Sequence, residues 1–265
     1  MTNPAAHDGS HAARITLLHR ARRAANGFGI EVRRLHDPLS FESRRLAVMQ
    51  RLGVDLVIDV GANQGQFAGS LRRRGYPGRI VSFEPVREAF EELTAKAASD
   101  PLWDCRCRAL GAESGAAGMS VAANLYSSSL LPIEPSHVAA APDSATVRTE
   151  EVAVERLDDE MQGLDLARRR VFLKLDVQGF ERDVLAGAGQ TLPSVLALET
   201  ELSAKRLYAG QMLWRDMVGL IEAHGLRLHA LEEEFVDPRT GEILQLNGLF
   251  VRESLRTVDD PHGPK

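Results

Sequence analysis

Residues 54–67, VDLVIDVGANQGQF, join an apolar run directly to a short polar loop flanked by glycines. The run DLVIDV at 55–60 is typical of a strand that is buried on both faces of a parallel sheet. It nevertheless contains Asp59, and a buried carboxylate is costly unless something binds to it. A helix is expected after the loop, because Phe67 and Leu71 stand four residues apart. This stretch therefore predicts a strand, a ligand-binding loop and a helix in succession.

The same alternation of apolar runs and helical patterns continues along the chain. The last two apolar runs flank the turn-rich connector DPRTGE, so they are expected to form an antiparallel hairpin. The sequence predicts an α/β protein with a Rossmann-like, mostly parallel sheet, an antiparallel C-terminal strand and helices on both faces. Further strands are expected at 79–85, 103–111, 146–157 (near the sheet edge), 171–181, 194–202, 226–236 and 243–253, and further helices at 86–98 and 211–224.

Changes in amino-acid composition divide the chain into three parts. We expect a basic, partly helical N-terminal extension at 1–48, a main domain at 49–255 and a polar tail at 256–265. Residues 112–145 interrupt the main domain with a stretch rich in Ala, Ser, Gly and Pro. A structureless connection of that length is uncommon in a compact domain unless it has a function. We therefore expect this inserted segment to fold over the functional site.

Arginine is concentrated near the N-terminus. Residues 14–45 contain eight arginines against three acidic residues. Such a segment either presents a solvated basic face while it packs on the main domain, or contacts anionic lipid headgroups or an acidic substrate. Both interpretations stay open, and the second predicts a peripheral contact with a membrane surface.

Charge and cysteine content exclude several classes of protein. The formal net charge of -5 argues against a dedicated nucleic-acid binder, which is usually basic. The two cysteines, Cys105 and Cys107, are too few for a disulfide framework or a zinc site. No apolar run approaches the ~20 residues of a membrane helix, and the N-terminus lacks the apolar core of a signal peptide. We expect a cytoplasmic protein that binds no nucleic acid, and these features also allow a homo-oligomer.

The glycine loop and the acid that ends the next strand indicate the ligand. Gly61 and Gly65 let the backbone turn and approach a ligand closely. Glu84 follows Gly61 by 23 residues, where its carboxylate can accept hydrogen bonds from both hydroxyls of a ribose. The dinucleotide pattern G-x-G-x-x-G is broken, because Asn63 takes the place of the middle glycine. Asp59 would repel a pyrophosphate but would help to hold a cation, which favours S-adenosylmethionine as the ligand.

Several motifs, in this order and spacing, resemble the FkbM-type S-adenosylmethionine-dependent methyltransferases. They are VIDVGANQGQFA, VSFEPVREAFEEL, the ALG at 109–111, the serines at 127–129, VERLDD, LKLDVQGFERDVLAGA and LALETELS, which together cover about residues 54–202. One departure is DVQG where the family usually has DVEG, so no catalytic role is assigned to Gln178. The resemblance implies a class I methyltransferase fold and, usually, O-methylation of sugar or polyketide hydroxyls. It also implies cofactor contacts at Asp59, Gly61, Ala62, Asn63, Gly65, Phe67, Glu84, Pro85, Ala109, Leu110 and Asp176.

Asp176 and Glu199 end two further predicted strands. Since the carboxyl ends of parallel strands face one crevice, these acids are expected beside Asp59 and Glu84 and free for the acceptor. Methyl transfer to a hydroxyl needs alignment and a route for the hydroxyl proton. Asp176 is one candidate for the base, although it also suits the N-cap of the next helix.

Two further ways of removing the proton of the acceptor hydroxyl stay open. Asp176 and Glu199, with Glu201 as a further ligand, could hold Mg²⁺, which would acidify and orient a hydroxyl. The resemblance supports this second cofactor, because related sugar O-methyltransferases use acids at those two strand ends for a metal. His137, in the inserted segment, is a third candidate for the base.

We therefore expect an O-methyltransferase whose acceptor is a sugar hydroxyl of a glycolipid, a polysaccharide or a glycosylated natural product. Two alternatives from other classes stay open. One is a non-catalytic partner subunit that only binds S-adenosylmethionine, and the other is a nicotinamide-dependent oxidoreductase.

Overall fold

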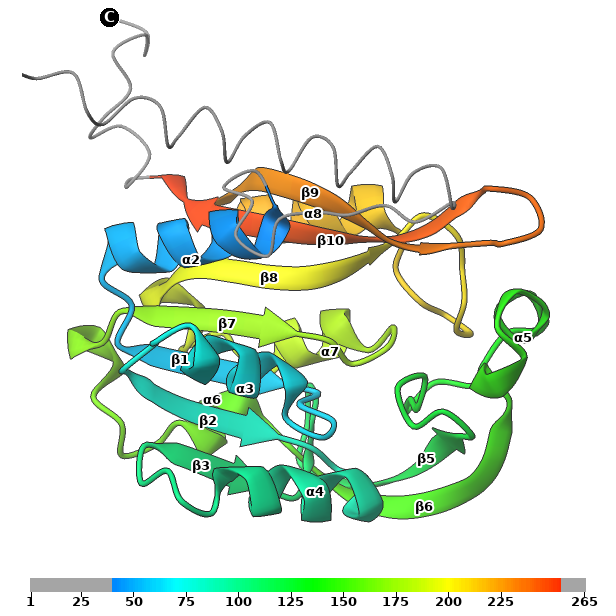
Figure 1. Cartoon of the computed structure of the whole chain (residues 1–265), viewed down its shortest axis with the longest axis horizontal. Coiled ribbons are helices and arrows are strands. Elements are labelled where there is room, and N and C mark those ends of the chain that lie inside the picture. The colour runs from blue at the N-terminus through cyan, green and yellow to red at the C-terminus, as the bar shows by residue number, and fades with distance from the viewer. Residues whose placement is uncertain (1–39, 254–265) are drawn as a thin grey trace, which may run out of the picture. The chain divides into compact units, whose positions relative to one another are not determined.

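The computed structural model describes residues 40–253 of the 265-residue chain (Figure 1). The chain divides into two units, Met1–Ser43 and Arg44–Lys265, and the fold described below belongs to the second. Most of the arginine-rich segment and the whole predicted polar tail at 256–265 lie outside the described residues. The helix α2, Phe41–Leu52, begins at the end of the first unit and continues into the second.

The centre of the second unit is a seven-stranded sheet with the order β3-β2-β1-β7-β8-β10-β9. The strand β10 is antiparallel to both of its neighbours, and the other pairings are parallel. The prediction of a mostly parallel sheet with an antiparallel C-terminal strand is therefore confirmed. The strands are β1 Leu56–Val60, β2 Arg79–Phe83, β3 Trp103–Arg106, β7 Val171–Leu175, β8 Val195–Ser203, β9 Leu226–Val236 and β10 Ile243–Arg252.

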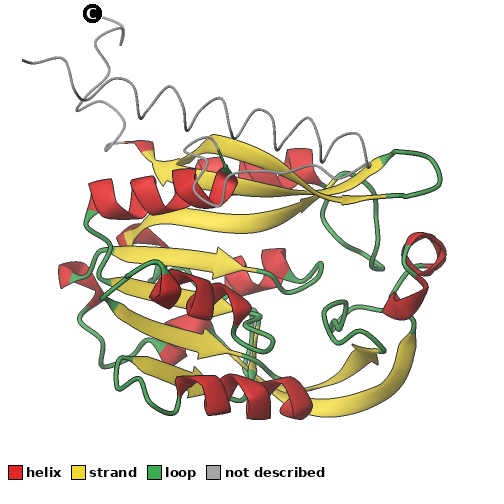
Figure 2. Cartoon of the chain, viewed as in Figure 1, coloured by secondary structure: helices red, strands yellow, loops and turns green. Residues whose placement is uncertain are grey.

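The direction in which the chain crosses the sheet decides where its helices lie. From β1 the chain moves through β2 to β3, whereas from β7 it moves the opposite way to β8. Because parallel crossovers are right-handed, the two directions place their helices on opposite faces. Figures 1 and 2 show α3 and α4 on one face and α7 and α8 on the other, as predicted. The helices are α3 Gln66–Arg73, α4 Arg87–Ala97, α5 Pro135–Ala140, α6 Leu157–Glu160, α7 Glu181–Ala186 and α8 Trp214–Ala223, with short 3₁₀ turns at Pro142–Ser144, Leu166–Arg168 and Leu192–Ser194.

The middle strands form the core because helices cover them on both sides. Every residue of β1 is buried, and Ile58 lies level with Val81 of β2 and Leu173 of β7. All three side chains are fully buried, which contributes roughly 1.5–3 kcal/mol each. The apolar run therefore makes β1 the fixed centre from which the loop at 61–65 projects.

A second, three-stranded sheet corrects part of the prediction. Its order is β4-β6-β5, with β4 Ala109–Leu110, β5 Gly115–Ala122 and β6 Thr146–Glu155. The segment 146–157 was expected near the edge of the main sheet, and 103–111 as one strand. Instead β6 pairs outside the main sheet, and 103–111 divides into β3 and β4. In β6 only alternate residues, Val152 and Val154, are buried, which fits an antiparallel strand covered on one face. The inserted segment is not structureless, since it contains β5 and α5.

Gly61 is a position where only glycine fits. Its φ is 75°, and a Cβ there would lie 1.8 Å from the carbonyl oxygen of Asp176. Gly75 has a similar φ of 84°, but no atom of the described residues lies within 4 Å of the place that a Cβ would take there. The loop after β1 therefore packs main chain against main chain on the loop after β7.

Gly61→Ala is predicted to destabilise the protein by more than the ~1–3 kcal/mol that a left-handed non-glycine residue costs. The extra loss comes from the contact with Asp176. Gly75→Ala is the matched control and should lose only the conformational cost. Urea unfolding of both variants measures the difference, and equal losses would contradict the contact.

Candidate functional site

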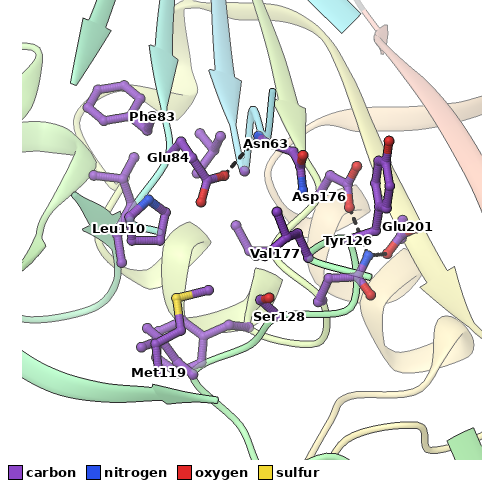
Figure 3. Close-up of a pocket in the computed structure, with 18 of the residues that line it drawn as sticks. Asn63, Phe83, Glu84, Leu110, Met119, Tyr126, Ser128, Asp176, Val177 and Glu201 are labelled. Carbon is purple, nitrogen blue, oxygen red and sulfur yellow. Dashed lines mark hydrogen bonds between the residues drawn. The ribbon is translucent and has the colours of Figure 1, made fainter. Parts of the chain in front are cut away.

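The strand order reverses between β1 and β7, and the carboxyl ends of these strands lie side by side. Open α/β sheets bind ligands in the crevice at such a switch point. A cavity of about 270 Å³ lies there, and Figure 3 shows the side chains around it. It is lined by Val60, Gly61, Asn63, Phe83, Glu84, Pro85, Arg108, Ala109, Leu110, Met119, Leu125, Tyr126, Ser128, Leu130, Asp176, Val177, Gln178, Phe180, Glu201 and Glu234.

Glu84 lines the cavity from the end of β2. Its two carboxylate oxygens accept hydrogen bonds from different backbone N–H groups, those of Asn63 and Val86, each at 2.8 Å. The side chain is 5% exposed, and burial raises its pKa to about 7. The carboxylate is thus held in one orientation while each oxygen keeps a lone pair for a ligand.

Asn63 explains how the loop turns without the middle glycine. Its φ is 47°, in the left-handed region that asparagine tolerates better than most residues. Its side-chain oxygen accepts a hydrogen bond of 2.8 Å from the N–H of Gln64, which stabilises the turn. Its backbone N–H is thereby free to point at Glu84. The loop and the strand-end acid are therefore one hydrogen-bonded unit.

The opposite end of the cavity holds several carboxyl groups around one amide. The Nε2 of Gln178 donates to Asp176 Oδ1 at 2.9 Å and to Glu201 Oε2 at 2.7 Å. Its Oε1 accepts a 2.6 Å hydrogen bond from the hydroxyl of Tyr208. Burial raises the pKa of Glu201 well above its usual value, and the nearby Asp176, Glu181 and Glu234 raise it further. This end of the cavity is negative and polar, and Gln178 holds it together.

The chain is similar to a known protein family. The sequence model of the family described as the methyltransferase FkbM domain matches residues 59–228, which is more than half of the chain. The chain belongs to the FkbM methyltransferase family. Membership confirms the resemblance seen in the motifs and removes the alternative of a nicotinamide-dependent oxidoreductase. No curated protein matches the sequence significantly.

Solved structures with a similar chain trace include two methyltransferases and one protein that holds S-adenosyl-L-methionine, all of low identity. Fibrillarin from Aeropyrum pernix, with natively bound S-adenosyl-L-methionine, is 12% identical with a TM-score of 0.44, over 78% of this chain and 74% of that chain. Magnesium protoporphyrin IX methyltransferase from Synechocystis PCC 6803 is 13% identical with a TM-score of 0.40, over 95% and 100%. A TehB-like methyltransferase from Corynebacterium glutamicum is 13% identical with a TM-score of 0.38, over 91% and 100%.

Of the residues predicted to contact the cofactor, this FkbM domain brings seven to the cavity and keeps four away from it. Gly61, Asn63, Glu84, Pro85, Ala109, Leu110 and Asp176 line it, whereas Asp59, Ala62, Gly65 and Phe67 do not. Gly65 is required for another reason, because its φ is 79° and a Cβ would lie 2.9 Å from Leu93. Phe67 stacks on Phe172 at 6.2 Å between ring centres. These two residues hold α3 on the sheet.

Asp59, predicted to hold a positively charged ligand, does not line the cavity. Its side chain is completely buried in β1, and its carboxylate lies 3.5 Å from the ammonium of Lys174. Ser82 also donates a hydrogen bond to it at 3.3 Å. The cation that compensates Asp59 is therefore internal. The same Lys174 lies 3.0 Å from Asp176, so it joins the ends of β1 and β7.

The predicted metal site of Asp176, Glu199 and Glu201 is not assembled. Glu199 points away from the cavity and forms a two-pronged ion pair with Arg45, at 2.5 and 2.7 Å. Lys174 already supplies a cation to Asp176. Within residues 40–253, no group of three or more His, Cys, Asp or Glu side chains is arranged to hold a metal ion. These residues do not fit Mg²⁺, and Glu199 has no access to an acceptor.

His137 is also absent from this cavity. Its ring is buried, 3% exposed, and packs edge-on against Tyr208 with 5.1 Å between ring centres. The role of base in the first cavity therefore does not fit it. Sequence reasoning missed Gln178 and Glu234 as site residues. The departure DVQG was the signal for Gln178, but it was interpreted only as the loss of an acid.

The part of the chain that the structure describes includes no helix long and apolar enough to cross a membrane. The predicted membrane-surface contact concerns the arginine-rich segment, most of which lies outside residues 40–253.

The Arg45–Glu199 pair yields a stability prediction. Arg45→Met leaves a carboxylate buried and unpaired, so it should destabilise the protein by roughly 3–5 kcal/mol. The double variant Arg45→Met/Glu199→Met should recover at least half of that loss, because it removes the stranded charge. Urea unfolding of the single and double variants measures the coupling. Losses that simply add would contradict the pairing.

Proposed function

We propose that the protein is an S-adenosylmethionine-dependent O-methyltransferase that acts on a sugar hydroxyl of a glycolipid, a polysaccharide or a glycosylated natural product. The observation that carries the proposal is a single cavity with an oriented carboxylate at one end and a cluster of carboxyl groups at the other. Family membership supports methyl transfer, and the chemistry of the cavity supports the donor and the kind of acceptor.

The Glu84 end of the cavity suits the nucleoside part of the donor. The two oriented oxygens of Glu84 can each accept a hydrogen bond from one ribose hydroxyl, and hydrogen bonds to a charged acceptor are among the stronger kind. Figure 3 shows Phe83, Leu110 and Met119 on that side of the cavity. Their apolar surface suits a purine ring. The carboxyl cluster across the cavity suits the positively charged sulfonium and ammonium groups.

The cluster also supplies a route for the acceptor proton. In methyl transfer a carbon–oxygen bond forms while the carbon–sulfur bond breaks, the electron pair stays on sulfur, and the hydroxyl gives up its proton. Asp176 suits this base less well than expected, because Gln178 and Lys174 each donate to one of its oxygens. Glu201 suits it better, because it lines the cavity and both hydrogen bonds that it accepts, from Gln178 and Gln245, go to Oε2. Its Oε1 accepts none from the described residues and can take the proton.

We leave the metal out of this proposal, since the residues present do not fit one. The membrane-surface contact of the basic segment, the cytoplasmic location and a homo-oligomeric state stay predictions. The membrane-surface contact is compatible with an acceptor carried on a lipid, which a peripheral protein could reach at a membrane surface.

Glu84→Gln tests the donor site. The variant should bind S-adenosylhomocysteine roughly 10–100-fold more weakly in calorimetry, because hydrogen bonds to charged groups contribute about 1.5–3 kcal/mol. The exposed Glu91→Gln on α4 is the control and should bind like the wild type. Unchanged affinity in Glu84→Gln would contradict the ribose contact.

The affinity should also depend on pH. Since burial raises the pKa of Glu84 to about 7 and the ionised form accepts the ribose hydroxyls, protonation competes with binding. Wild-type affinity for S-adenosylhomocysteine should fall by up to tenfold per pH unit below 7, and Glu84→Gln should lack this part of the dependence. Calorimetry between pH 5.5 and 8 measures both profiles, and parallel profiles would count against the assignment.

Incubation with isotopically methyl-labelled S-adenosylmethionine and sugar-bearing lipid or polysaccharide extracts tests the reaction itself. Transfer of label to a sugar oxygen, located by mass spectrometry, is expected. Donor binding without transfer to any extract would favour the non-catalytic partner subunit.

A further inference from the structure

A second cavity of about 240 Å³ adjoins the first. Four residues line both cavities: Tyr126, Gln178, Glu201 and Glu234. They come from the inserted segment, the loop after β7, β8 and β9, so the common wall forms only in the folded chain. Glu201, the carboxyl group proposed to take a proton, thus faces both spaces. A group that enters the second cavity meets the contents of the first across this wall.

One residue that lines the second cavity, His137, carries a polar atom that the described part of the protein leaves unsatisfied. The Nδ1 of His137 is buried and has no hydrogen-bond partner among residues 40–253. Burial lowers the pKa of His137, so its ring is neutral near pH 7. A buried polar atom without a partner costs about 1–3 kcal/mol, which a ligand hydroxyl in this cavity would relieve.

The rest of the lining suits a sugar ring. Phe235, whose ring centre is 5.7 Å from that of His137, offers an apolar face for ring C–H groups. The side chains of Asn124, Ser127 and Gln245 offer hydrogen-bonding groups around it. This combination of one apolar face and several hydrogen-bonding groups suits a single small polar ring.

The charge of the wall restricts that ring further. Glu201 and Glu234 both face the second cavity, and none of the described lysines and arginines lines it. A carboxylate or phosphate on the ring would find no cationic side chain there, and an unpaired charge in a partly desolvated space is unfavourable. An uncharged ring avoids this cost, and an amine can pair with either carboxyl group.

We propose that this second cavity, bounded by His137, Phe235, Gln245 and the wall at Glu201, is the acceptor site and takes an uncharged or amine-bearing pyranose ring. The inference rests on the proposed function, because it assumes that the first cavity holds the methyl donor. One ring hydroxyl binds the Nδ1 of His137, while the hydroxyl to be methylated reaches the wall beside Glu201. The identity of the acceptor is thus selected by charge and by ring size.

A matched pair of alanine substitutions tests the site. Ala141 lines the second cavity, whereas Ala139, two residues earlier on α5, is exposed and lines neither cavity. Ala141→Trp should fill the cavity and Ala139→Trp should not. His137→Phe is a second variant, which keeps the ring packing and removes the nitrogen. All three variants should bind S-adenosylhomocysteine within twofold of the wild-type affinity in calorimetry. That binding also shows that each variant is folded.

Ligand-observed NMR in the presence of S-adenosylhomocysteine measures acceptor binding, with the methyl glycosides of glucose, galactose, mannose, glucosamine and glucuronic acid as probes. At least one neutral or amine-bearing glycoside should bind to the wild type and to Ala139→Trp, and at least tenfold more weakly to Ala141→Trp and His137→Phe. The glucuronide should not bind. Equal binding to all variants, preference for the glucuronide, or no glycoside binding to protein that holds S-adenosylhomocysteine would overturn the inference. Absence of S-adenosylhomocysteine binding would instead contradict the proposed function.

Discussion

The convergence of acidic side chains at one edge of the sheet is the constraint on which this structure depends. Parallel strands bring their carboxyl ends together, so the acids of four strands come close to one another, and three of them, Asp59, Glu84 and Glu199, are buried. Each is compensated differently: Asp59 and Asp176 by Lys174, Glu199 by Arg45, and Glu84 by two backbone N–H groups. Burial by itself would lower the pKa of Lys174, but Asp176 and Asp59 outweigh it and raise that pKa above its usual value. The ends of β1 and β7 are thus joined by a charge that the fold itself supplies.

This compensation is incomplete at one place, and that place is the site. Glu201 receives hydrogen bonds from the amides of Gln178 and Gln245, at 2.7 and 3.2 Å, but no cationic side chain pairs with it within residues 40–253. Burial also raises the pKa of Glu234. The glutamine in DVQG places a neutral hydrogen-bond donor between Asp176 and Glu201 and adds no charge of its own. Glu201 is therefore available to a cationic donor and to the proton of an acceptor.

Sequence reasoning located the ligand edge because it depends on local features. An apolar run, a glycine loop and an acid at the next strand end are close in the chain, so Gly61, Asn63 and Glu84 were predicted together. The partner of Glu199 was not predictable in this way, because Arg45 is 154 residues away and reaches it only through tertiary packing. Nor does strand periodicity alone say which buried acid meets an internal cation, so the contact between Asp59 and Lys174 was not foreseen.

The inserted segment was the part least accessible from sequence. Its small residues predicted only that it has a function and folds over the site, whereas in the structure β5 pairs with β6 in a separate sheet and carries Met119 to the first cavity. The position of Tyr126 between the two cavities depends on that pairing. Non-local pairing of this kind leaves only weak alternation in the sequence, so the role of the segment was predictable while its structure was not.

The most direct test of this account is a crystal structure of the protein with S-adenosylhomocysteine bound. The account predicts that both ribose hydroxyls lie within hydrogen-bond distance of the Glu84 carboxylate and that the sulfur faces the side chains around Gln178. A ligand bound outside this cavity, or a ribose that does not contact Glu84, would contradict it.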